Sequence, residues 1–105
     1  MDRIVLIRIL RVLIRIKVMS KLEFNSECTV SIYPSVQMMT KMGYKSMYDM
    51  SDDLESVVKI NYPGLLEQGY AQFDPESEGF MVYCTDRDVQ ETIYNEWKEF
   101  VNSCV

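Results

Sequence analysis

The C-terminal part of the chain carries a stripe of apolar residues at helical spacing, and this stripe constrains the fold more than any other feature. It consists of Val89, Ile93, Trp97, Phe100, Val101 and Cys104. Thr85-x-x-Asp88 lies just ahead of the stripe and resembles a capping box, the pattern with which many helices begin. A helix that is apolar along one side needs a second apolar surface to cover that side.

Short alternating and aromatic runs supply candidate strands for that surface. Residues 28–33 alternate between apolar and polar side chains, which is typical of a strand with one buried face. Pro34 turns the chain, and we expect residues 36–40 to return as the second strand of a hairpin. Residues 70–73 and 80–84 predict a second hairpin, whose strands are joined by a tight acidic loop.

A helix is predicted in the middle of the chain. Ser51 is a suitable N-cap because acidic residues follow it in the first turn, where the helix dipole favours negative charge. Leu54 and Val58 recur at helical spacing, and Pro63-Gly64 ends the helix before a short helical turn. The order of elements predicts one α+β domain over residues 19–105, with an antiparallel sheet of about four strands (two hairpins) and helices packed on one face.

Residues 1–18 differ from the rest of the chain. Eleven of the fifteen residues in 4–18 are Ile, Val or Leu, and five basic residues stand against one acid in 1–18. Helical spacing of the arginines indicates a basic amphipathic helix, whereas the Ile and Val content, with alternation over residues 15–18, favours a strand. The abrupt change at Met19 favours a third interpretation, in which the native chain starts there and residues 1–18 are an added extension.

Charge and residue usage exclude several classes of function. The chain has 11 basic and 16 acidic residues, a net charge of -5, so neutralisation of nucleic-acid phosphates is not expected. It has no histidine, which excludes His-dependent catalytic sites and most zinc sites, and no nucleophile has an identifiable base beside it. Three cysteines without CxxC spacing indicate buried thiols in a reducing compartment. We therefore expect a cytoplasmic protein that is not an enzyme and uses no cofactor or metal.

Methionine and tyrosine are concentrated between Met38 and Met50. Such flexible and aromatic side chains commonly fill irregular gaps in a core. The same residue types are also enriched at the centres of protein interfaces. The sequence leaves both interpretations open for this segment.

Several motifs together resemble the immunity protein 51 family of bacterial polymorphic toxin systems, over about residues 29–100. The matching runs are Tyr62-Pro63-Gly64-Leu65-Leu66, Phe73-Asp74-Pro75-Glu76 and Phe80-Met81-Val82-Tyr83-Cys84, with Gly43-Tyr44 ahead of them and an amphipathic helix behind. The chain departs from the family after Tyr44, where Lys45-Ser46 replaces an aromatic and acidic stretch. The resemblance implies a small cytoplasmic α+β protein that binds a cognate toxin domain and neutralises it.

An acidic surface with tyrosines suits the covering of a basic cleft, such as the active site of a nuclease. The residues expected to contact the toxin are Tyr44, Tyr48, Asp49, Asp52, Asp53, Asp74, Glu76 and Glu78. The acidic loop also invites a calcium interpretation, but its spacing is a poor match, and Asp-Pro more often forms a turn.

Two alternatives use the same sequence differently. A phage-encoded anti-defence protein would place the acidic surface in the nucleic-acid channel of a host effector. A regulatory domain would instead use residues 1–18 as an amphipathic anchor on a membrane surface.

Overall fold

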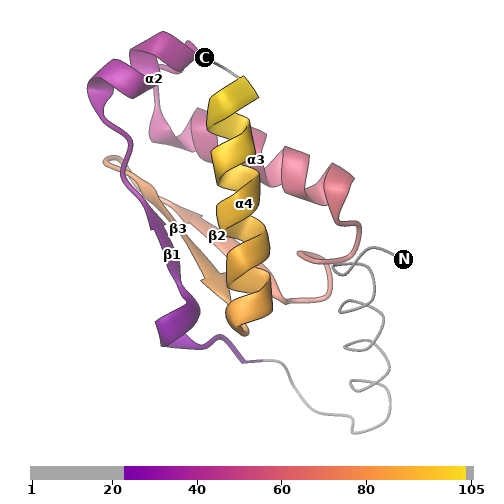
Figure 1. The fold of residues 1–105 in the computed structure, drawn as a ribbon. Helices are drawn as coiled ribbons and strands as arrows, with labels where there is room; N and C mark the ends of the chain where they lie inside the picture. Colours follow the sequence, from indigo (N-terminus) through magenta and orange to yellow (C-terminus); the bar gives the residue numbers. More distant parts are fainter. Residues whose placement is uncertain (1–22, 104–105) are drawn as a thin grey trace, which may run out of the picture.

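The computed structural model describes residues 23–103, which form a three-stranded antiparallel sheet covered by helices (Figure 1). In chain order the elements are η1 (Ser26–Cys28), β1 (Val30–Ile32), α2 (Val36–Met42), α3 (Met47–Asn61), β2 (Ala71–Pro75), β3 (Phe80–Cys84) and α4 (Arg87–Ser103). The strand order is β1-β3-β2, so β3 is central and β1 and β2 are the edges among the described residues. This confirms the α+β class and the antiparallel sheet.

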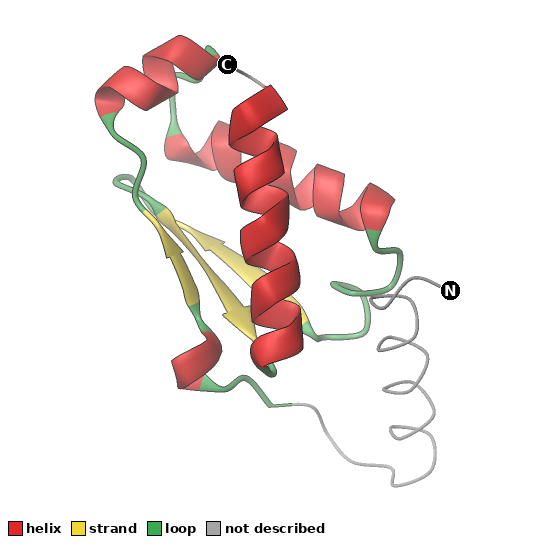
Figure 2. Ribbon diagram, in the orientation of Figure 1, coloured by secondary structure: helices red, strands yellow, loops and turns green. Residues whose placement is uncertain are grey.

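The core lies on one face of the sheet. Phe80, Val82 and Cys84 alternate along β3 with half-buried residues and are themselves almost completely buried. The register places Val30 opposite Val82, so β1 adds to the same apolar face. Helices α3 and α4 both pack on this face and cross each other there (Figure 2).

The alternation over residues 28–33 produces the predicted strand, but the predicted first hairpin is wrong. Residues 36–40 belong to helix α2, so the described sheet has three strands rather than four. The reason is local capping, because the Ser35 hydroxyl accepts a hydrogen bond from the Met38 N–H at 3.1 Å. Gly43 ends this helix in the left-handed conformation at φ +84°.

The central helix begins earlier than predicted. Its N-cap is Ser46, whose hydroxyl accepts from the Asp49 N–H at 3.2 Å, whereas Ser51 lies buried inside the helix. The additional first turn buries Met47 and Met50, which confirms core filling for these two methionines. The helix ends at Asn61, and turns over residues 62–70 then lead into β2.

The C-terminal helix is confirmed, although its cap is Asp86 rather than Thr85. The Asp86 carboxylate accepts a hydrogen bond from the Val89 N–H at 3.1 Å. Val89, Ile93 and Phe100 are buried, as the stripe predicts, while Cys104 lies outside the described residues. The buried side also includes Thr92 and Glu96, and the Glu96 carboxylate accepts from the Asn61 side chain at 3.1 Å.

Two of the three cysteines are buried free thiols, as predicted. Cys28 closes η1 and Cys84 ends β3. Burial, with a smaller contribution from Cys28, raises the pKa of the Cys84 thiol to about 12. Cys84 is therefore protonated at neutral pH and serves as a small core residue rather than a nucleophile.

No helix within residues 23–103 has the length and apolar character needed to cross a membrane. The interpretations of residues 1–18 concern a segment outside the described residues.

Candidate functional site

Four of the predicted partner-binding residues form an exposed group on the first half of α3. Tyr48, Asp49, Asp52 and Asp53 are all exposed, and Tyr48 keeps 50% of its surface accessible. Residues 48 and 52, and residues 49 and 53, are one helical turn apart, so their side chains are neighbours on the helix surface. The structure therefore brings these residues together as one acidic face with an aromatic side chain in it.

Tyr44 packs against the core with its ring and contacts this acidic face with its hydroxyl. Its ring is half-buried and stacks on Phe100, with ring centroids 6.1 Å apart. Its hydroxyl donates a hydrogen bond of 2.6 Å to the Asp53 carboxylate. Tyr44 thus positions an acidic residue of α3 as well as lying beside it.

We expect Tyr44→Phe to lower the free energy of unfolding by about 0.5–1.5 kcal/mol, because the variant loses the hydrogen bond to Asp53 and keeps the ring. Urea unfolding followed by circular dichroism measures this change. Tyr48→Phe is the matched control, since that side chain is half-exposed, and it should change stability by about 0.5 kcal/mol or less. Equal losses in the two variants would contradict the structural role of the Tyr44 hydroxyl.

The other three predicted residues lie at the β2–β3 hairpin. Glu76 and Glu78 are exposed in the turn, which the Glu76 N–H closes by donating to the Gly79 carbonyl at 2.8 Å. Asp74 is half-buried, and its carboxylate accepts a hydrogen bond of 2.7 Å from the Tyr83 hydroxyl. This hydrogen bond is the largest cause of the raised pKa of Tyr83. Asp74 is thus hydrogen-bonded to a residue of β3, while Glu76 and Glu78 are exposed to solvent in the turn.

The two acidic groups lie at the same end of the domain. Helix α3 packs against β2, and the turns after Asn61 send the chain back in the opposite direction. The start of α3 and the β2–β3 turn are therefore neighbouring ends (Figure 1). Within residues 23–103, no three His, Cys, Asp or Glu side chains are placed to hold a metal ion.

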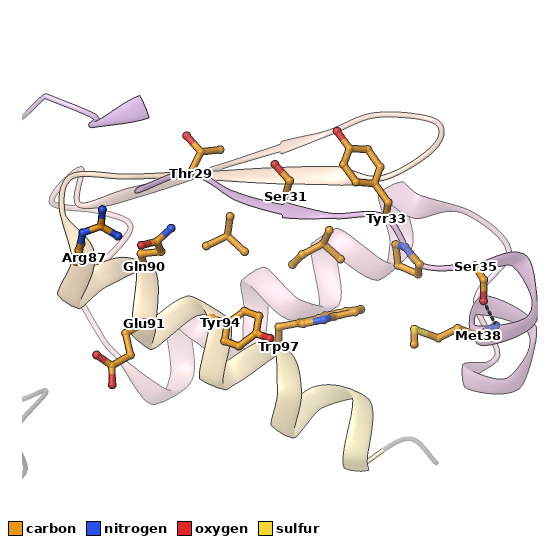
Figure 3. A pocket seen from close by; sticks show the side chains of 13 residues that line it. Thr29, Ser31, Tyr33, Ser35, Met38, Arg87, Gln90, Glu91, Tyr94 and Trp97 are labelled. Atoms are coloured by element: carbon orange, nitrogen blue, oxygen red, sulfur yellow. Dashed lines mark hydrogen bonds between the residues drawn. The ribbon is translucent and has the colours of Figure 1, made fainter. Parts of the chain in front are cut away.

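Sequence reasoning missed a groove between β1 and α4. The groove has a volume of about 790 Å³. One wall is formed by residues 29–35 and Met38, and the other by Arg87, Gln90, Glu91, Tyr94 and Trp97 of α4 (Figure 3). Some fifty residues of sequence separate the two walls, so no local pattern could reveal that they face each other.

A chain of aromatic rings connects this β1–α4 groove to the core. Trp97 meets Phe80 edge-on at 5.9 Å and stacks on Phe100 at 6.0 Å. Phe100 in turn stacks on Tyr44, and Phe80 on Phe73 at 6.3 Å. The groove wall at Trp97 therefore belongs to the same packed cluster that holds Tyr44 in place.

Comparison with known proteins identifies no relative of this chain. No family model matches it, and neither the curated proteins nor the solved structures contain a significant match.

Proposed function

We propose that this protein is an immunity protein, which binds a basic toxin domain and neutralises it by stoichiometric blockade. The supporting observation is the acidic end of the domain, where the start of α3 and the β2–β3 turn both carry exposed carboxylates (Figure 1). Residues 23–103 contain fifteen acidic and five basic residues. The acids therefore outnumber the basic side chains of this region three to one, and the exposed carboxylates among them present negative charge to a basic partner.

The charges and the tyrosine have different roles in this proposal. Exposed carboxylates attract a basic cleft from a distance and mainly raise the association rate. Tyr48 supplies the apolar contact area at the centre of the acidic face, since tyrosine is enriched among the residues that dominate binding energy. Blockade of this kind needs no catalysis and no cofactor, and it protects the cytoplasm of the bacterium that makes the toxin.

Pairs of neutralising substitutions test the proposal. The probe is the toxin domain encoded next to this gene, with association measured by biolayer interferometry at low and high salt. At low salt we expect Asp49→Asn/Asp52→Asn and Glu76→Gln/Glu78→Gln each to slow association about tenfold. At high salt the difference from the natural chain should shrink, because screening weakens interactions between exposed charges.

The control is Glu23→Gln/Glu27→Gln, which removes the same number of charges from exposed positions at and before η1. It should slow association by less than about threefold, since these charges lie outside the proposed interface. Equal effects of all three pairs would show a general charge effect and contradict the acidic end as the binding surface. Binding to a host nucleic-acid effector instead of the toxin domain would favour the anti-defence alternative.

A further inference from the structure

Strand β1 presents a hydrogen-bonding edge to the β1–α4 groove. Gly79 and Thr85, the residues that flank β3, bond on the β2 side, since the Glu76 N–H donates to Gly79 and the Thr85 N–H donates to Tyr70. The N–H and C=O groups of successive residues point to opposite sides of an antiparallel strand. The backbone groups of the even-numbered residues of β3 therefore point toward β1. Their partners Val30 and Ile32 therefore bond inward, and the N–H and C=O of Ser31 point away from β3.

Next to this edge, the groove has an apolar wall formed by side chains of α4. Trp97 and Tyr94 rise from α4 on the core side of β1, while Ser31 and Tyr33 lie on the opposite side of the strand (Figure 3). Tyr94 and Tyr33 remain 51% and 61% exposed. An extended segment placed here would bond to the Ser31 backbone and alternate between an apolar side facing α4 and a polar side facing solvent.

We propose that residues 11–18 of this chain bind in the β1–α4 groove as a fourth strand, added to the edge of β1 that has no neighbouring strand within residues 23–103. In this segment Val12, Ile14, Ile16 and Val18 alternate with Arg11, Leu13, Arg15 and Lys17. An added strand would direct the first set toward Trp97 and Tyr94 and the second toward solvent. The strand interpretation of the N-terminal residues thereby acquires a binding site that offers a strand edge and an apolar wall.

Charge and chain length agree with this occupant. Residues 1–18 contain five basic residues and one acid, and they adjoin a region with a large excess of acidic residues. Ten residues lie between Val18 and Thr29, where the groove wall begins. Residues 25–28 of this stretch are already placed, because the Asn25 N–H donates to the Cys84 carbonyl at 2.9 Å and residues 26–28 form η1. The connection therefore consists of residues 19–24, which span up to about 20 Å, enough to cross the strand spacing of about 5 Å and run back antiparallel to β1.

Amide hydrogen exchange of the full-length chain, followed by NMR, tests the proposal at Ser31. If residues 11–18 are bound, the Ser31 amide exchanges at least about tenfold more slowly in the natural chain than in Ile14→Asp. Leu13→Asp is the matched control, because it introduces the same charge one position earlier and on the solvent side of the strand. We expect this control to leave Ser31 protected.

Trp97 provides a second readout, since it is the single tryptophan of the chain. Ile14→Asp should increase acrylamide quenching of its fluorescence, and Leu13→Asp should not. Fast exchange of Ser31 in the natural chain would overturn the proposal, as would protection that survives Ile14→Asp. Protection that rises with protein concentration would assign the groove to a second copy of the chain and would also overturn it.

Discussion

Replacing Phe80 by alanine lowers the free energy of unfolding by about 3–5 kcal/mol, the range for deleting a buried ring. Phe80 is 1% exposed and begins the central strand. Its ring packs between Phe73 and Trp97, at centroid distances of 6.3 and 5.9 Å. The cavity would open where the sheet meets α4, so neither element can close it without losing its other contacts.

Chemical denaturation followed by circular dichroism measures this effect, because fluorescence would report the changed surroundings of Trp97 itself. Phe24→Ala is the control, since that ring is 43% exposed and meets Tyr83 at 6.0 Å. It should cost about 1 kcal/mol or less. A loss at Phe80 no larger than at Phe24 would contradict the placement of the core on this face of the sheet.

Gly79→Ala is expected to destabilise the domain by about 1–3 kcal/mol, the usual cost of forcing extra volume into a packed site. A Cβ atom at Gly79 would lie 2.5 Å from the Ile32 carbonyl oxygen and 2.4 Å from the Tyr33 ring. The exposed tyrosine ring can move aside, but the Ile32 carbonyl belongs to strand β1. The substitution therefore pushes β1 away from the β2–β3 turn.

A double substitution separates the two contacts. Gly79→Ala/Tyr33→Ala removes the ring and keeps the clash with the Ile32 carbonyl, so it should remain destabilised relative to Tyr33→Ala alone. Gly43→Ala is a further control, because a Cβ there meets nothing within 4 Å and only the left-handed backbone at φ +84° resists it. Full recovery in the double variant would mean that the tyrosine ring, and not the strand, limits the space at Gly79.

Patterns within one element predicted the fold well. The stripe from Val89 to Phe100 specifies α4, because helical spacing is a local property of the chain. The alternation at Val30 and Ile32 specifies β1 for the same reason. The prediction failed where two local signals competed, since a Ser35 cap and the Gly43 terminator outweighed the strand propensity of residues 36–40.

For the candidate binding residues, the sequence indicated which residues to consider but not the contacts that hold them. Sequence reasoning identified the acidic residues of α3 and of the β2–β3 turn, because acidic side chains near a helix start and in a turn can be read directly from the sequence. It did not reveal that the Tyr44 hydroxyl holds Asp53 or that the Tyr83 hydroxyl holds Asp74. Each of these pairs spans nine residues and forms only when two neighbouring elements pack.

The sequence by itself determined the acidic character of the domain, the absence of histidine chemistry, the terminal helix and the strands around the acidic turn. These features depend on residue type and on spacing within one element. The tertiary structure alone decided the strand order, the position of the two acidic groups at one end and the groove between β1 and α4. Each of these depends on which elements pack together, and that choice is made by the shared apolar core rather than by any local segment.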